Sequence, residues 1–180
     1  MDNHNHHHHH DHNWVEHKKR GKIQEFIVHL LWAELEFDVK YGIIKRAKLA
    51  GVKGEANKNY KFTVSDEDWL LRAIEKHVQN AKSKLNWACK NVARFSSDEL
   101  LRHPLEYNLL FVFDDVEWLG SSNDLMNYIH EYVTNACVAE WLEMEQSPTY
   151  QSLKEKAEDN LNKAWTELNH VIIETPKFIL

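Results

Sequence analysis

Three histidines, His77, His130 and His170, each lie in a different helix that the sequence predicts. Three imidazoles supplied by three helices of a bundle can hold a metal ion. The zinc signature His-Glu-x-x-His is absent from the chain. We therefore expect these residues to be ordinary core or surface histidines, and we expect no metal site and no cofactor.

An acidic cluster, Glu34, Glu36 and Asp38, falls in the first predicted helix. Residues four apart share a helix face, so Glu34 and Asp38 could act as a carboxylate pair in acid–base catalysis. Lys40 and Lys45 follow closely. Because opposite charges at such spacings are typical of a solvated helix surface, we expect a charge-balanced helix end rather than a catalytic pair.

An arginine and a histidine, Arg72 and His77, are separated by four residues in the second predicted helix. This spacing resembles the RNA-cleaving motif of small all-α HEPN-type ribonucleases, in which two protomers pool the pair. Ala73 departs from the motif, since that family usually has a polar residue there. We expect a surface or structural pair and no catalytic residues. An all-α ribonuclease that uses Arg72 and His77 is the alternative hypothesis.

The composition is typical of a soluble globular protein. The chain has 180 residues, of which 28% are charged, and a formal net charge of −6. No apolar run approaches the roughly 18 residues of a membrane span, and the His-rich start is not the apolar segment of a secretory signal. We therefore expect no membrane contact. The net negative charge argues against a nucleic-acid footprint over the whole surface.

The two cysteines, Cys89 and Cys137, fall in predicted helices and are far from any Cys-x-x-Cys spacing. Cysteine is among the residue types most often buried, and disulfides are rare in reducing compartments. We expect two buried free thiols.

Apolar spacing predicts helices over 22–50 and 65–92, the first followed by a loop and the second begun by Ser65 as a capping box with Asp68. In the first helix, the predicted apolar face includes Phe37 and Tyr41. A short strand or extended link is expected at 59–64, a short helix near 95–100 and a strand at 109–113.

The strongest signal is a helical hairpin, 124–146 with 149–173, broken at Ser147-Pro148. Apolar residues recur at steps of three and four in both halves, and Pro148 fits only at or just before the first turn of the second helix. We expect the hairpin to be the densest part of the core. The expected core anchors of the whole chain are Trp69, Tyr132, Trp141 and Trp165.

Together these elements predict a mainly α fold, a bundle of about four helices with one or two short strands and extended termini. We expect one domain over 22–173, preceded by a His-rich arm at 1–21 that is either a tag or native. A tail at 174–180 follows, in which Pro176 ends the helix. Because Phe178, Ile179 and Leu180 are large and apolar, we expect them to dock onto a different chain.

Several segments, taken in order, carry a resemblance. They are a Gly- and Lys-bearing loop at 48–58, Tyr-x-Phe-Thr-Val at 60–64, Ser-Asp-Glu-Asp-Trp-Leu-Leu at 65–71, Phe-Val-Phe-Asp-Asp at 111–115, Tyr-Ile-His-Glu-Tyr-Val at 128–133, Glu140-Trp141, and a last helix with Tyr150, Lys156-Ala157 and Leu161. Over about residues 22–170 this order resembles the small head–tail connector (adaptor or neck) proteins of tailed bacteriophages and of prophages in gut Bacteroidetes.

The resemblance implies a virion structural protein that is not an enzyme. Such proteins form cyclic rings, typically twelvefold, beneath the portal protein, and they bind the next tail or neck protein. DNA passes through the lumen without specific binding, and exposed acids such as Asp114, Asp115 and Glu117 could face it, because like charge does not grip phosphates. The location implied is the virion neck, and the host cytoplasm during assembly. A helical interaction domain outside any virus is the remaining alternative.

Overall fold

The computed structural model describes residues 23–49, 64–96 and 103–173. The elements in these ranges are β1 (Gln24–Leu31), α1 (Trp32–Leu49), α2 (Val64–Lys84), β2 (Cys89–Phe95), β3 (Glu106–Phe113), β4 (Val116–Trp118), α3 (Ser122–Met144), α4 (Tyr150–Leu168) and β5 (Val171–Ile173). The predicted mainly α bundle with one or two strands is therefore wrong, because the strands form two sheets and the fold is mixed α and β.

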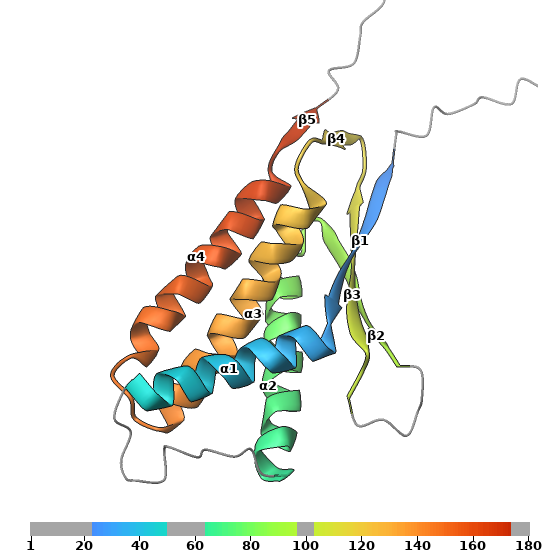
Figure 1. Ribbon diagram of the computed structural model, residues 1–180. Coiled ribbons are helices and arrows are strands. Elements are labelled where there is room, and N and C mark those ends of the chain that lie inside the picture. Colours follow the sequence, from blue (N-terminus) through green and yellow to red (C-terminus); the bar gives the residue numbers. More distant parts are fainter. Residues whose placement is uncertain (1–22, 50–63, 97–102, 174–180) are drawn as a thin grey trace, which may run out of the picture.

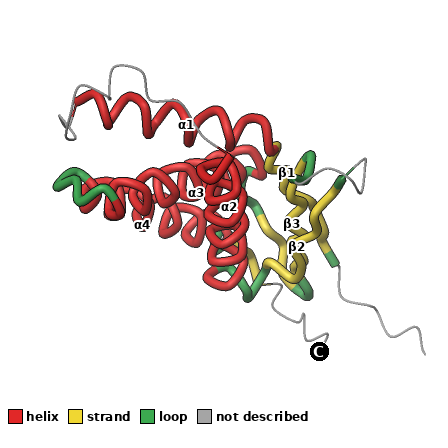
Figure 2. Tube along the Cα trace, turned by 90° about the horizontal axis from the view of Figure 1, so that it is seen from below, coloured by secondary structure: helices red, strands yellow, loops and turns green. Residues whose placement is uncertain are grey.

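The larger sheet is antiparallel, with the strand order β1-β3-β2, and β4 pairs with β5 in a two-stranded ribbon. Strands and helices lie on opposite sides of the molecule (Figure 2). In β3, Tyr107, Leu109, Phe111 and Phe113 are buried, whereas the alternate residues are half-exposed. The sheet thus has one face in the core and one open face, as period-two burial requires.

The predicted first helix is in fact a strand followed by a helix, so the prediction is wrong for its first third. The alternation of apolar and polar residues that marks a strand is not visible in β1, because apolar residues lie on both of its faces. Val28 and Leu30 are buried, while Ile27 and Leu31 are exposed on the open face. The predicted apolar face of α1 is also wrong. The buried residues of that helix are Trp32, Leu35, Val39 and Ile43.

The second predicted helix is too long, because α2 ends at Lys84 and β2 begins at Cys89. A hydrogen bond from the Val112 N–H to the Ala88 carbonyl joins the turn between α2 and β2 to β3. The chain therefore pairs with the sheet in the region where the sequence predicted a continued helix. The expected strand at 59–64 and short helix at 95–100 lie largely outside the described residues. Within them, α2 already begins at Val64 and Phe95 belongs to β2.

The helical hairpin is confirmed as α3 and α4, which make the most extensive contact between any two elements of the described chain (Figure 1). Ser121 caps the start of α3, since its side-chain oxygen accepts a hydrogen bond from the Asp124 N–H. At the other end of α3, Gln146 adopts a left-handed φ of 53°. Bonds from Gln146 N–H to Glu143 O and from Ser147 N–H to Leu142 O close a Schellman motif there. The second helix ends at Leu168, and β5 follows instead of more helix.

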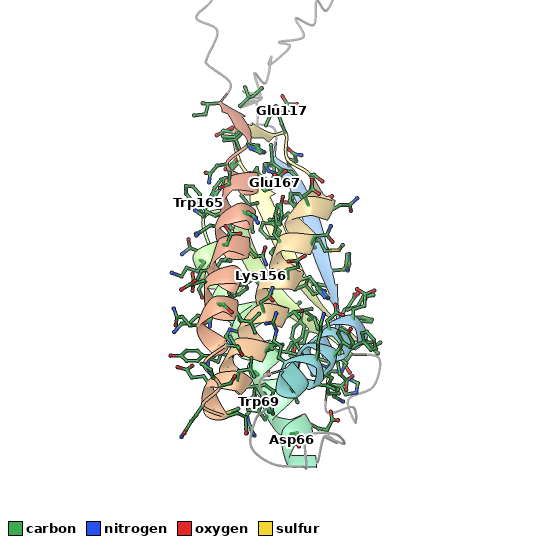
Figure 3. The ribbon with its side chains drawn as sticks, turned by 60° about the vertical axis from the view of Figure 1, so that its left-hand side comes forward. Asp66, Trp69, Glu117, Lys156, Trp165 and Glu167 are labelled. Carbon is green, nitrogen blue, oxygen red and sulfur yellow. The ribbon has the colours of Figure 1, made fainter. Side chains whose placement is uncertain are left out.

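The expected core anchors have different outcomes. Trp141 and Tyr132 are buried, with Trp141 only 5% exposed, and Trp69 is half-buried against the core. Trp165 is 50% exposed on the outer side of α4, so that expectation is wrong (Figure 3). Its neighbour Ala164 fills the core position, because adjacent residues of a helix point about 100° apart.

Candidate functional site

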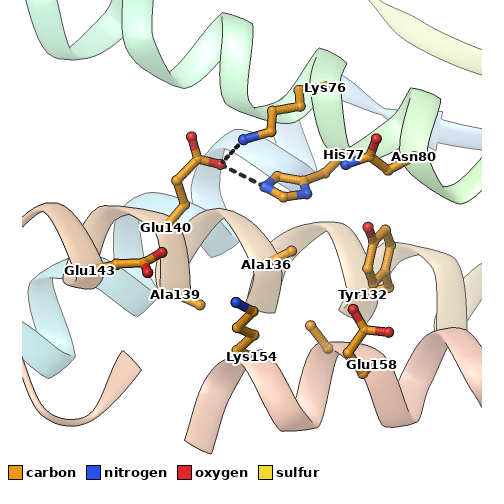
Figure 4. Close-up of a pocket in the computed structure, with 11 residues that line it drawn as sticks. Lys76, His77, Asn80, Tyr132, Ala136, Ala139, Glu140, Glu143, Lys154 and Glu158 are labelled. Atoms are coloured by element: carbon orange, nitrogen blue, oxygen red, sulfur yellow. Dashed lines mark hydrogen bonds and ion pairs between the residues drawn. The ribbon is translucent and has the colours of Figure 1, made fainter. Parts of the chain in front are cut away.

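The strongest polar cluster joins α2 to α3. His77 Nε2–H donates to Glu140 Oε2 at 2.8 Å, and Lys76 Nζ approaches the same oxygen at 3.0 Å (Figure 4). The His77 side chain is 12% exposed and the Lys76 side chain is largely exposed. One carboxylate oxygen therefore receives two donors from adjacent residues of the facing helix.

The protonation state of His77 follows from its surroundings. Burial lowers the pKa of His77, and the hydrogen bond with Glu140 offsets this only in part. Its other ring nitrogen, Nδ1, is buried without a hydrogen-bond partner. A proton there would be a buried donor lacking an acceptor, which is costly. The side chain is therefore neutral near pH 7, with its single proton on Nε2.

Glu140 is held ionised by the same contacts. Burial raises the pKa of Glu140, but the hydrogen bonds and charges of Lys76 and His77 outweigh burial and leave the pKa below its usual value. The carboxylate thus stays charged at neutral pH and fixes the two donors.

Next to this cluster lies a pocket of about 220 Å³ between α2, α3 and α4. Ala136, Ala139 and Ala157 line it, and their short side chains leave this space between the helices unfilled. The polar lining is Lys76, His77, Asn80, Tyr132, Glu140, Glu143, Lys154 and Glu158 (Figure 4). Burial raises the pKa of Tyr132 to about 12, so its hydroxyl remains protonated at neutral pH.

This arrangement is suited to holding helices together more than to catalysis. The His77 Nε2–H is directed at Glu140, and the unprotonated Nδ1 is buried, so neither ring nitrogen is presented to the pocket as an accessible base. The thiols are unreactive near pH 7, because burial raises the pKa of Cys89 to about 11 and that of Cys137 well above its ordinary value. Both are free and buried, as the sequence predicts.

The structure does not bring Arg72 and His77 to one site within a chain. Residues five apart on an α-helix are rotated by about 140°. His77 therefore faces α3, whereas Arg72 is exposed to solvent.

The other candidate residues form separate pairs. His130 Nε2 lies 2.9 Å from Asp38, and His170 Nδ1 lies 3.5 Å from Glu167. His170 follows the end of α4 and is not in a helix. In the ranges 23–49, 64–96 and 103–173, no three His, Cys, Asp or Glu residues gather where they could hold a metal ion.

The acidic cluster of α1 is divided among different partners. Glu36 accepts from Trp32 Nε1 at 3.0 Å and from Lys40 Nζ at 2.7 Å, and Lys40 also reaches Glu67 of α2 at 2.6 Å. Asp38 binds His130. Of the possible carboxylate pair, Asp38 thus contacts His130, and the contacts of Lys40 and Asp38 attach α1 to α2 and α3.

Two of the exposed apolar surfaces that the described residues form outside the sheet were not predicted from the sequence. The first, the α1 ridge, consists of Phe37 (67% exposed), Tyr41 (55% exposed) and Lys45. The two rings are stacked with centroids 6.2 Å apart, and Lys45 Nζ lies 5.9 Å from the Tyr41 centroid. The sequence signal for this surface was the pair Phe37 and Tyr41, which are four residues apart and therefore share a helix face that differs from the face of the buried residues.

The second surface, the ribbon tip, consists of Leu119, directly after β4, and of Ile172 and Ile173 in β5, and all three side chains are exposed. The ribbon lies at one end of the molecule, and α1 lies toward the other (Figure 1). Glu117 stands at the ribbon end, and Asp66 and Trp69 of α2 stand at the far end (Figure 3). Phe178, Ile179 and Leu180 follow the ribbon in the sequence and lie outside the described residues.

Among the helices that the structure describes, none combines the length and apolarity needed to cross a bilayer. The chain matches no known protein family, no curated protein and no solved structure.

Proposed function

We propose that this chain is a structural protein that assembles by binding copies of itself head to tail, and that it serves as a phage head–tail adaptor. The observation that carries the proposal is the presence of two unlike apolar surfaces, the α1 ridge and the ribbon tip, toward opposite ends of one chain.

Head-to-tail contact requires this arrangement. Burying a large apolar side chain contributes about 1.5–3 kcal/mol, and clustered exposed apolar residues mark interaction surfaces. Two different surfaces that bind each other generate a closed ring when the rotation between copies closes. The ribbon tip of one copy would pack on the α1 ridge of the next.

The virion role comes from the resemblance over about residues 22–170. The proposal places the ring beneath the portal, in contact with the next tail or neck protein. The tail follows Ile173 directly, so Phe178, Ile179 and Leu180 would add to the same contact with a neighbour or the portal. Asp114 and Asp115, both exposed next to the ribbon, would present negative charge to passing DNA and not hold it.

Particle mass and negative-stain electron microscopy of the purified protein test the ring. We expect closed rings from the wild type and none from Phe37→Glu or from Ile173→Glu. Trp165→Glu is the matched control, because it adds the same charge at an exposed apolar residue outside both surfaces. Wild-type particles that never exceed a few copies would contradict the proposal.

Mixing the two defective variants tests whether the contact is head to tail. Each variant keeps one intact surface, so an equimolar mixture should form a pair that cannot grow further. If Phe37→Glu and Ile173→Glu stay monomeric when mixed, the two surfaces do not bind each other. Images of the native neck, with this ring present or absent beneath the portal, decide the virion role.

A further inference from the structure

β1 forms an unprotected edge of the three-stranded sheet. It pairs with β3 on one side, and no other strand of the described chain pairs with its second side (Figure 2). It runs for eight regular residues without proline, lysine or bulge. The opposite edge, β2, carries a register irregularity between Cys89 and Asn91 and the cations Lys90 and Arg94. Bulges and charges of this kind protect an edge from pairing, so β1 is the edge that remains competent to pair.

The open face of β1 has a self-complementary pattern. Along the strand and the residue before it, the outward residues are Ile23, Glu25, Ile27, His29 and Leu31, and all are exposed. Read from either end, this order is apolar, ionisable, apolar, ionisable, apolar, with an acid and an imidazole at the two ionisable positions.

We propose that β1 pairs antiparallel with β1 of a second copy, in the register that places Ile27 opposite Ile27. Ile23 of each copy then lies opposite Leu31 of the other, and Glu25 lies opposite His29 twice. Side chains directly opposite on one face of an antiparallel pair are within contact distance. Every apolar residue of the row thus meets an apolar residue, and each carboxylate meets an imidazole.

The side chains can make these contacts from their present positions. His29 Nδ1 lies 3.4 Å from Glu106 Oε2 of the neighbouring strand, and its side chain is 53% exposed. Nε2 therefore remains for the carboxylate of the second copy's Glu25. The pairing would merge two three-stranded sheets into one of six strands.

This contact differs from the proposed ring contact and does not depend on it. It is isologous, since the same surface serves both copies, whereas the ring contact joins two different surfaces. If both occur, paired β1 strands join two rings face to face. If the ring proposal fails, the pair remains as a dimer.

Disulfide cross-linking tests the register. In this register the two Cα atoms of residue 27 are about 5 Å apart, within the range of a disulfide, which ends near 7 Å. Those of residue 31 are eight positions apart along the pair, about 26 Å. Under mild oxidation Ile27→Cys should form a covalent dimer and Leu31→Cys should not. The native thiols are buried and do not interfere. Equal cross-linking of both variants, or none of Ile27→Cys, would overturn the proposal.

A charge exchange tests the Glu25–His29 contacts. Glu25→Lys alone places lysine opposite histidine, and His29→Glu alone places two acids opposite each other. Both variants should lose the β1 pair, seen as a halved particle mass. When the two variants are mixed, the introduced lysine of one copy lies opposite the introduced glutamate of the other. The native His29 of the first copy then lies opposite the native Glu25 of the second, so the pair should return.

Ala93→Lys is the control for the charge exchange, since it adds charge to the same open face on β2. This variant should keep the particle mass of the wild type. Loss of the pair in the control as well, or no recovery on mixing, would show that β1 is not the contact.

Discussion

His77 of α2 and Glu140 of α3 share a hydrogen bond of 2.8 Å in which the neutral imidazole is the donor. Burial lowers the pKa of His77 in the folded chain, so the unfolded chain takes up this proton first as the pH falls. Stability from this group is complete above the ordinary histidine pKa of 6.5 and is lost as the pH falls toward the folded value.

Glu140 acts in the same direction at lower pH. Its folded pKa is lowered below the ordinary 4.5, because the contacts with Lys76 and His77 outweigh burial. The unfolded chain again binds the proton first, so this stability is present above pH 4.5 and is lost as the pH falls through the folded value.

We therefore expect the free energy of unfolding to decline in two steps below pH 6.5. His77→Gln should flatten the upper step and leave the lower one, as measured by urea unfolding from neutral to acidic pH. His170→Gln serves as the control, because that side chain is exposed. An unchanged slope through the histidine range in His77→Gln would show that another group causes the decline.

Trp141→Ala should destabilise the protein by about 3–5 kcal/mol, since a large buried ring is replaced by a cavity. Trp165→Ala should change stability by less than about 1 kcal/mol, because surface substitutions have small effects. Chemical denaturation of the two variants makes the comparison. Similar losses in both would mean that the outer side of α4 is covered.

Gly42 of α1 faces α3 at very short range, and a Cβ at this position would lie 2.8 Å from Val138 Cγ2. Gly42→Ala should therefore cost about 1–3 kcal/mol by overpacking. The double variant with Val138→Ala should recover part of this loss, because the methyl groups that clash are removed. A stable Gly42→Ala would show that α1 can shift away from α3.

Gln146 occupies the left-handed position that closes α3, with φ at 53°. A side chain in this conformation costs about 1–2 kcal/mol, so Gln146→Gly should raise the melting temperature. Gln151→Gly, in the exposed first turn of α4, should lower it, since glycine weakens helices. If both variants were destabilised, relief of backbone strain at position 146 would be outweighed by the flexibility of glycine.

Deletion of Lys177 to Leu180 should leave the melting temperature of the monomer almost unchanged and abolish attachment to the partner ring. The reason is our proposal that the three apolar side chains of this segment contact another chain and not their own core. Thermal unfolding and co-sedimentation with assembled rings measure the two effects. A lower melting temperature with attachment preserved would assign the tail to its own core.

The helical hairpin was predictable because the buried residues of each helix recur at steps of three and four and so lie on one face. Ile129, Val133 and Leu142 in α3, and Leu153 and Leu161 in α4, are all buried, and Pro148 separates the two runs. The predicted burial of Trp165 was wrong because it relied on the size of the side chain. The helical spacing of the buried residues of α4 places Ala164, and not Trp165, in the core.

The strands were harder to predict for a different reason. β1 carries apolar residues on both faces, so its sequence lacks the apolar–polar alternation of a strand and also fits the apolar spacing of a helix. β2 depends on hydrogen bonds to β3, which follows it by a loop, and no glycine or proline marks the end of α2 at Lys84. The α1 ridge misled the assignment of the first helix, because Phe37 and Tyr41 resemble core residues in the sequence.

The His77–Glu140 cluster could not be found from the sequence. His77 and Glu140 are far apart in the chain, and only the packing of α2 on α3 makes them partners. The sequence near His77 instead drew attention to the spacing of Arg72 and His77, yet the helix directs those two side chains to different sides.

The junction of β1 and α1 has a mechanical consequence. The strand ends at Leu31 and the helix begins at Trp32, with no linking residue. The Trp32 N–H bonds the Leu105 carbonyl, its indole N–H bonds Glu36, and its ring stacks on His103. Because no linking residue separates the two elements and Trp32 is held by three contacts, we expect a force applied along β1 to be transmitted directly to α1.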